Sequence, residues 1–348
     1  MKEMLVTIVI PCYNAEEYLS GIITDIQQQQ YPNIETVIVS NGEKQERQLE
    51  TVREQIVDMT NIQVLHTDEA GVSNARNLGL LSAKGEWICF IDADDRIRPN
   101  HIQLLVEAID DDCDVIEGGF EQIDINGQSA KVTYPNTKYD LTLEKNGLYK
   151  ERVSDVIHKV GNAPWNKLFR RSFLINSKLL FDTKYTMNED RIFAMSAFLK
   201  ARNWKFIPMT GYIYKASYGS AMSRYHANVE ESWTDYLDLR DKIKLRSGQD
   251  KAQICQERID MQYYLVWQYI WNMFKPGCPY PFSTKVIKIR ELMNDEDFAT
   301  SCRFHDWKKE SLRYKLFYRC IRTGSPLIVA LLFGSQHYGK QLVNLLKR

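Results

Sequence analysis

Short apolar runs alternate with amphipathic stretches along the first third of the chain. The apolar runs have the length of interior strands and lie at 5–10, 36–39, 62–65, 87–91 and 115–118. Between them, apolar residues recur at the spacing of one helix face over 14–26, 49–56, 72–83 and 100–109. Asn14 and Glu17 form a capping box for the first of these helices. Strands alternating with helices through short connections predict an α/β fold with a mostly parallel sheet.

The pattern changes from about residue 120. Extended segments are predicted at 120–125 and 130–134 around an Asn-Gly turn, and a further short strand at 210–214. From 228 onward the chain is predicted to be helical, and 261–274 carries aromatic residues at helical spacing, which is more typical of a core than of a ligand site. The proline-rich stretch 276–281 predicts a hinge between two helical pieces. We therefore expect an α/β domain over 1–225 and a helical C-terminal region over 226–348.

Composition narrows the class of protein. The chain has 348 residues, enough for a large core, and its 45 basic and 45 acidic residues give no reason to expect a nucleic-acid partner. Its seven cysteines are scattered and form no C-x-x-C pair, which argues for reduced thiols and against a disulfide framework or a zinc site. No apolar run has the length of a membrane span, and none is followed by a cleavage pattern. A cytoplasmic location is therefore expected.

The charge is distributed unevenly, because residues 303–348 carry ten Lys/Arg and only two acidic residues. Apolar residues alternate with these cations. This combination is typical of a segment that lies on an anionic membrane surface, where each Lys or Arg contributes about 1 kcal/mol. A peripheral position at the inner face of the membrane follows from that interpretation. The alternative is that the apolar residues pack on the domain and the charges are solvated, and both stay open.

The strongest candidate for chemistry is Trp87–Arg96, WICFIDADDR, where a buried strand runs into a cluster of carboxylates. Asp92, Asp94 and Asp95 follow the carboxyl end of that strand, which is the edge where open α/β sheets bind ligands. A hard divalent ion shared with a diphosphate would relieve the repulsion among these carboxylates. The alternative is a polar turn whose aspartates cap the next helix.

Five segments taken together resemble the family 2 glycosyltransferases, which are inverting enzymes with the GT-A fold. They are VTIVIPCYN (6–14), GVSNARNLGL (71–80), GEWICFIDADD (85–95), NED (188–190) and YIYKASYGSAMS (212–223), and the likeness covers roughly residues 5–225. The resemblance implies a nucleotide-binding half over 1–118 and an acceptor half over 119–225. It implies a metal-dependent hexosyltransferase of bacterial polysaccharide or cell-surface glycan biosynthesis. The expected donor is a nucleotide-diphospho-sugar, with UDP-sugar favoured, and the expected acceptor is a hydroxyl of a glycan or a lipid-linked glycan.

The resemblance also implies a set of donor-binding residues. These are Pro11, Tyr13, Asn14, Ser40, Asn41, Arg76, Asp92, Ala93 and Asp94. Asp92 and Asp94 match the family's D-x-D motif and would hold Mn²⁺ or Mg²⁺. Arg76 would reach the nucleotide or hold the aspartate loop, unless it is an ordinary arginine on a helix surface.

One departure from the family pattern concerns the base. The second strand ends in Val39-Ser40-Asn41-Gly42, where the family has aspartates. Neutral Ser40 and Asn41 can still form hydrogen bonds with a base, so the departure puts the identity of the base in doubt. It also motivates an alternative function, a catalytically impaired protein of the same fold that binds a sugar nucleotide.

The pair Glu189-Asp190 resembles the family's catalytic pair, and Asp190 would be the general base that takes the acceptor proton. The alternative is that the pair only satisfies the amides and the dipole at a helix N-terminus. Trp165 offers either a sugar-stacking face or part of a packed corner. Asp95 would hold a metal-bound water or a neighbouring side chain, and Tyr214, Lys215 and Ser220 would close over the diphosphate.

Two other classes of α/β enzyme fit the sequence less well. Phosphatases of the haloacid-dehalogenase type place their Asp-x-Asp on the first strand, with Thr or Val two residues later, whereas this chain has it on its fourth strand with Arg96 at that position. Nicotinamide dehydrogenases need a Gly-x-Gly-x-x-Gly turn after the first strand, and residues 11–15 contain no glycine.

Overall fold

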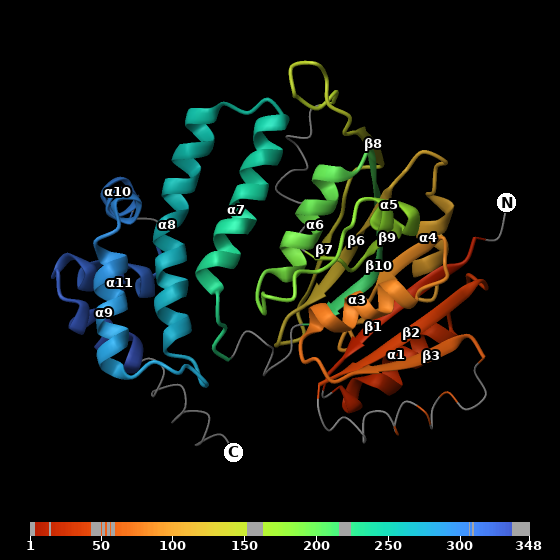
Figure 1. The fold of residues 1–348 in the computed structure, drawn as a ribbon, viewed down its shortest axis with the longest axis horizontal. Helices are drawn as coiled ribbons and strands as arrows, with labels where there is room; N and C mark the ends of the chain where they lie inside the picture. The colour runs from red at the N-terminus through yellow and green to blue at the C-terminus, as the bar shows by residue number, and fades with distance from the viewer. Residues whose placement is uncertain are drawn as a thin grey trace. The chain divides into compact units, whose positions relative to one another are not determined.

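The computed structural model describes residues 4–13, 15–42, 50, 53, 56, 60–151, 163–215, 224–305, 307 and 310–335. The chain divides into two compact units (Figure 1). The first consists of Met1–Ser220 with Asp238–Gly248, and the second of Ala221–Leu237 with Gln249–Arg348. The functional halves 1–118 and 119–225 stay a prediction.

The first unit contains a mixed sheet. Among the described residues its strand order is β3-β2-β1-β4-β9-β6-β10-β5, with β7 beside β6 and β8 beside β10. The four parallel strands on one side are β1 (Val6–Cys12), β2 (Ile34–Asn41), β3 (Ile62–Thr67) and β4 (Trp87–Phe90). They coincide with four of the predicted apolar runs. Of these strands, β1, β2 and β4 are almost wholly buried, which explains their apolar sequences. The predicted α/β class with a mostly parallel sheet is confirmed.

The other side of the sheet contains a strand that the sequence pattern did not predict. β9 (Lys167–Arg170) lies antiparallel between β4 and β6 (Val115–Ile123). A segment of four residues is too short to show a periodicity, so no local sequence signal predicts this strand. β6 also continues through the glycines at 118–119, where the apolar pattern predicted a break between two segments.

β10 (Asn203–Lys215) is much longer than the strand predicted at 210–214. It runs parallel to β6, with a shift in register between Ile207 and Tyr212. Pro208 lies in this irregular stretch and interrupts the apolar pattern, because proline cannot donate to a strand ladder. Three short strands complete the sheet, namely β5 (Arg96–Ile97), β7 (Ser129–Val132) and β8 (Thr137–Asp140).

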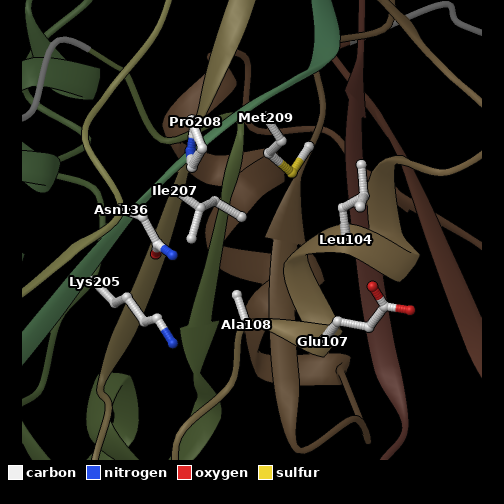
Figure 2. Close-up of a pocket in the computed structure, with 8 residues that line it drawn as sticks. All are labelled: Leu104, Glu107, Ala108, Asn136, Lys205, Ile207, Pro208 and Met209. Carbon is white, nitrogen blue, oxygen red and sulfur yellow. The ribbon is translucent and has the colours of Figure 1, made fainter.

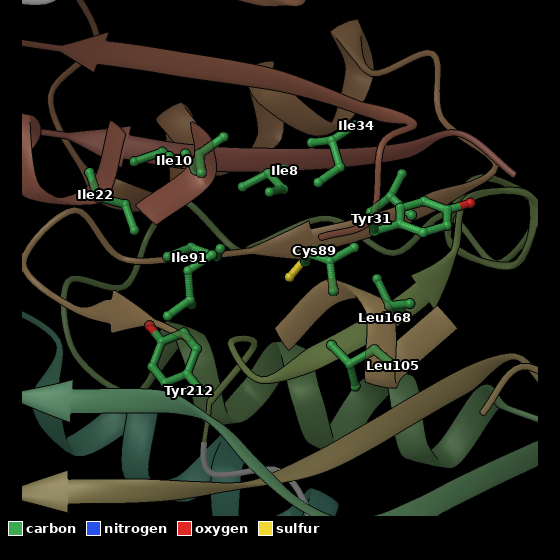
Figure 3. Packing of buried hydrophobic residues seen from close by; sticks show 14 of the residues in the cluster. Ile8, Ile10, Ile22, Tyr31, Ile34, Cys89, Ile91, Leu105, Leu168 and Tyr212 are labelled. Carbon is green, nitrogen blue, oxygen red and sulfur yellow. The ribbon is translucent and has the colours of Figure 1, made fainter. Parts of the chain in front are cut away.

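Helices cover both faces of this sheet. α1 (Glu16–Gln27) and α4 (His101–Glu107) contribute to one buried cluster with the residues of β1 that face them (Figure 3). α3 (Val72–Ser82) and α6 (Glu189–Lys200) lie on the opposite face, where Val37 packs with Ala75, and Phe90 with Phe193. A further short helix, α5 (Arg171–Asn176), follows β9.

Two predicted features of the first helices lie wholly or mostly outside the described residues. Asn14 lies outside them, so its predicted cap is not described, and the helix begins after Ala15 with no side-chain cap. The amphipathic helix predicted over 49–56 also lies mostly outside them.

The second unit is helical, as predicted. Its elements are α7 (Val229–Arg246), which also contributes to the first unit, α8 (Lys251–Met273), α9 (Phe282–Met293), α10 (Glu296–Phe304) and α11 (Leu312–Arg322). Asp250 caps α8 by accepting from the Gln253 amide at 3.0 Å. The aromatic stripe of α8 is core, since Tyr263, Val266 and Ile270 are buried in one cluster. The proline-rich stretch separates α8 from α9.

The basic C-terminal stretch contains both buried and exposed apolar residues. Phe317, Val329 and Phe333 are fully buried in the core of the second unit. In contrast, Leu312 is 80% and Leu331 is 56% exposed. Residues 336–348 lie outside the described part of the chain. Among the residues that are described, none of the helices has both the length and the apolar character required to cross a bilayer.

Candidate active site

The D-x-D residues follow β4 at the carboxyl edge of the parallel strands. β4 ends at Phe90, and the chain then turns so that Asp92 and Asp94 are partly exposed while Ala93 is buried. The Nη2 of Arg76 donates to Oδ1 of Asp92 at 2.7 Å. These two partly exposed aspartates supply the carboxylate oxygens that Mg²⁺ and Mn²⁺ prefer, so the donor set fits a hard divalent cation.

Arg76 joins the D-x-D loop to the second acidic motif. It lies on α3 with only 4% of its surface exposed, so it is not an ordinary surface arginine. Its Nη1 lies 3.5 Å from Oε1 of Glu189, and its guanidinium lies over the ring of Phe181 at 5.2 Å. Burial alone would lower the pKa of Arg76, but the charges of Asp92 and Glu189 outweigh it and raise the pKa. Arg76 is thus a permanent cation between two groups of carboxylates.

The second acidic motif opens α6. Asn188, at a φ of 65°, precedes Glu189, which is 9% exposed, and Asp190, which is partly buried. Burial, and then the charge of Asp190, raise the pKa of Glu189 to about 7. Burial also raises the pKa of Asp190, while Arg76 and Arg191 oppose that rise. A carboxylate with a raised pKa is a stronger base, as general-base chemistry requires.

Asp95 faces the protein interior. It is 1% exposed, and it accepts hydrogen bonds from the hydroxyl of Tyr212 and, at 2.9 Å, from the backbone N–H of Lys215. Burial, and then the charge of Asp92, raise its pKa to about 8. Of the two roles expected for Asp95, the structure shows the one in which it holds a neighbouring side chain. Lys215 meets this network through its backbone, and Ser220 lies outside the described residues.

The predicted base-binding residues lie at the ends of β1 and β2. Pro11 pairs with Val39 in the parallel ladder, and Ser40 and Asn41 are 1% and 2% exposed. Tyr13 is 50% exposed, and its ring lies against Gly42 so closely that a Cβ there would be 3.0 Å from its Cε2. Because Gly42 also has a φ of +95°, glycine is the residue that suits this position. An exposed tyrosine ring at this edge is available for stacking.

An aromatic wall, defined here as Trp165 and Tyr214, stands beside the D-x-D loop. Trp165 stacks on Tyr212 with ring centroids 4.7 Å apart and on Tyr214 with centroids 5.6 Å apart. Burial, and then the charges of Asp95, Asp94 and Asp92, raise the pKa of Tyr214. Tyr212 was not among the residues predicted to act in the site. Its only signal was a tyrosine two residues before Tyr214, which places both side chains on one face of a strand.

Two other features of the described residues lie away from this site. Asp110, Asp112 and Cys113 come close enough to hold a metal ion, but Lys138 donates to Asp112 at 3.0 Å and supplies the positive charge. The pocket in Figure 2 lies between α4 and β10 and is lined by Leu104, Ile207 and Met209 among others. It contains none of the predicted site residues.

The chain is similar to glycosyltransferases in sequence and in fold. A family model described as "Glycosyl transferase family 2" matches residues 7–177. The chain is 27% identical over 314 residues to the uncharacterized glycosyltransferase EpsJ of Bacillus subtilis, covering 88% of this chain and 89% of EpsJ.

Solved structures agree on the fold. The structure of Staphylococcus aureus TarS 1–349 in complex with UDP-GlcNAc covers 97% of this chain and 92% of its own, with a TM-score of 0.58 and 20% identity. The mannosyltransferase PcManGT of Pyrobaculum calidifontis, in complex with GDP-Man and Mn²⁺, covers 95% and 87%, with a TM-score of 0.50 and 13% identity. Residues 7–177 of the chain therefore match the family 2 glycosyltransferases, and its α/β unit has the GT-A fold of these solved structures.

Proposed function

We propose that the chain transfers a sugar, with inversion, from a nucleoside-diphosphate donor to a hydroxyl of a glycan or lipid-linked acceptor. The observation that carries the proposal is the network through Arg76. It joins Asp92 of the D-x-D motif to Glu189, which precedes Asp190 and lies 113 residues further along the chain than Arg76. A site that brings a donor-binding motif and a candidate base together has the two parts that sugar transfer needs.

The residues divide the chemistry between them. Asp190 takes the proton of the acceptor hydroxyl, and the oxygen attacks the anomeric carbon on the face opposite the leaving group. A single displacement of this kind inverts the anomeric centre. Asp92 and Asp94 would hold Mn²⁺ or Mg²⁺, which neutralises the charge on the departing diphosphate. Arg76 keeps Asp92 in position and favours the ionised form of Asp190.

Two variants test this assignment. Asp190→Asn keeps the shape of the base and removes its function, so donor binding should persist while turnover falls by roughly 10²–10⁴-fold. Asp94→Ala should weaken nucleotide binding only when the metal is present, as measured by calorimetry with and without Mn²⁺. Near-normal transfer by Asp190→Asn would leave Glu189-Asp190 as a helix cap. A wild-type chain that binds nucleotide but transfers nothing would favour the alternative function, a binding protein without turnover.

For the donor we propose a UDP-sugar with relaxed selectivity for the base. The TarS structure holds UDP-GlcNAc and the PcManGT structure holds GDP-Man, so neighbours of this fold bind different bases. Ser40 and Asn41 carry no charge, so base recognition would rest on hydrogen bonds and on stacking against Tyr13. Competition among UDP, TDP, CDP and GDP measures this. A sharp preference for UDP alone would contradict the relaxed selectivity.

We also propose that the second unit rests on an anionic membrane surface from the cytoplasmic side. Apolar side chains are exposed on two helical stretches at Leu312, Leu316, Leu327, Ile328 and Leu331. α11 adds only cations among its charged residues, including Arg319 and Arg322 in its last turn. Apolar residues beside cations suit lipid headgroups, and a lipid-linked acceptor would be held at the same membrane surface.

A further inference from the structure

Tyr212 contacts three parts of the molecule that are far apart in the sequence. It lies on β10 and is fully buried. Its hydroxyl donates to Asp95 and lies 3.4 Å from the backbone N of Asp92. Its ring stacks on Trp165 at an interplanar angle of 6° and meets the edge of the His101 ring at a centroid distance of 5.9 Å. Figure 3 shows Tyr212 beside Ile91, directly before the D-x-D motif.

The D-x-D loop is attached to the rest of the unit on both sides. After the loop, β5 pairs with β10, so that Ile97 lies opposite Tyr212. Asp25 of α1 forms a bidentate pair with the Arg96 guanidinium and accepts from the Ile97 amide at 3.1 Å. Within the loop, Arg76 holds the side chain of Asp92, and Tyr212 and the Lys215 amide hold that of Asp95.

The aromatic wall depends on the same tyrosine. Asn166, which follows Trp165, exchanges two hydrogen bonds with Gly118 and so holds its own backbone to β6. The Trp165 side chain is positioned by Tyr212, by Tyr214 and by an edge contact with Phe120 at 4.8 Å. Tyr212 is therefore the side chain that touches both the D-x-D loop and the wall.

We infer that Tyr212 is a positioning residue that holds the donor loop and the aromatic wall at one fixed spacing. Its hydroxyl places the D-x-D aspartates through Asp95, and its ring places Trp165, against which the acceptor sugar would stack. The inference rests on the proposed function. The physical reason is geometric, since a misplacement of about 1 Å in the reacting groups lowers a rate by roughly 10²-fold.

The two functions of Tyr212 can be separated by substitution. Tyr212→Phe removes the hydroxyl and keeps the ring, so Mn²⁺-dependent affinity for UDP should fall about tenfold and kcat about 10–100-fold. The KM for the acceptor should stay within about twofold, and the metal-free affinity for UDP should not change. Tyr212→Leu removes the ring as well, so the KM for the acceptor should rise too. Calorimetry and steady-state kinetics give these quantities.

Matched variants distinguish positioning from general loss of structure. Tyr31→Phe removes another buried hydroxyl of the same core cluster, one that donates to the Met4 carbonyl, and it should leave the kinetic constants unchanged. Asp95→Asn keeps an oxygen that can accept from the Lys215 amide and has an NH2 group that can donate to the Tyr212 hydroxyl. This variant should therefore retain more Mn²⁺-dependent affinity for UDP than Asp95→Ala. This second pair tests the link even if a Tyr212 variant does not fold.

The outcomes separate this inference from the proposed function. If Tyr212→Phe has the same metal-dependent affinity for UDP and the same kcat as Tyr31→Phe, the role of the Tyr212 hydroxyl is overturned. Equal acceptor KM values for Tyr212→Phe and Tyr212→Leu would overturn the role of the ring. A wild-type chain that binds no nucleoside diphosphate, with or without Mn²⁺, would overturn the proposed function itself.

Discussion

At the scale of single residues, the site depends on where charge is buried. Arg76 is 4% exposed and lies between Asp92 and Glu189, so one cation compensates carboxylates from two motifs. A buried charge of this kind is tolerated because it is paired, and removing it leaves uncompensated carboxylates. Arg76 thus holds Asp92 of the D-x-D motif and lowers the pKa of Asp190, the base that we propose.

The pH profile should report this control. Arg76 lowers the pKa of Asp190, so Arg76→Met should raise that pKa and keep the base protonated up to a higher pH. The acid limb of the kcat/KM profile should therefore move to higher pH, and the plateau should fall because Asp92 loses its partner. Arg98→Met is the control, because Arg98 forms an exposed pair with Glu121. An unmoved acid limb in Arg76→Met would contradict the role of Arg76.

A second residue-scale prediction concerns stability. His101 is fully buried, neither ring nitrogen has a hydrogen-bond partner among the described residues, and burial lowers its pKa from 6.5 to about 3. Below about pH 6.5 His101 binds a proton in the unfolded chain but stays neutral in the folded chain. The free energy of unfolding therefore decreases as the pH falls from 6.5 towards 3. The loss should approach about 1.4 kcal/mol per pH unit. His101→Leu should flatten this slope in urea denaturation, and an unchanged slope would contradict the assignment.

At the scale of elements, the antiparallel strand β9 completes the sheet between β4 and β6. It carries Lys167, which pairs with Glu117 of β6 at 2.9 Å while both side chains are almost wholly buried. Trp204 of β10 donates to the same carboxylate at 2.9 Å. This buried network fixes three neighbouring strands and the loop that carries Trp165.

Removing one partner of this pair should be costly. Lys167→Met leaves Glu117 buried without its cation, and the expected loss is about 3–5 kcal/mol in the free energy of unfolding. The double variant Lys167→Met with Glu117→Gln should recover much of that loss. Lys138→Met is the control, because its pair with Asp112 is exposed and should matter little. Chemical denaturation of the four chains measures this, and a loss in Lys167→Met as small as in Lys138→Met would refute it.

At the scale of the whole molecule, the question is what the basic C-terminal stretch does. Deleting it from Arg303 onward would remove Phe317 and Phe333 from the core of the second unit. A loss of liposome binding in such a truncation could therefore come from unfolding. Exposed leucines give a cleaner test. Leu327 is 48% and Leu331 is 56% exposed, and changing them leaves the core intact.

We expect the wild-type chain to pellet with anionic liposomes and not with neutral ones. The double variant Leu327→Glu with Leu331→Glu should lose most of this binding, because it buries charge in the headgroup region. Leu81→Glu with Leu180→Glu changes two exposed leucines of the first unit and should bind as the wild type does. Equal binding by both double variants, or none by the wild type, would make the stretch ordinary structure.

The parallel strands and the D-x-D motif can be located from local patterns in the sequence. Both are local signals, because a buried strand appears as an apolar run and the residues after it lie at the carboxyl edge of the sheet. The folded structure was needed to show that β9 lies antiparallel inside the sheet, that β10 extends back to Asn203, and that Arg76 and Tyr212 connect the parts of the site. These features depend on contacts between residues about a hundred positions apart, such as Arg76 with Glu189 and Asp95 with Tyr212. Periodicity over a short window contains no information about such partners, so only the folded chain identifies them.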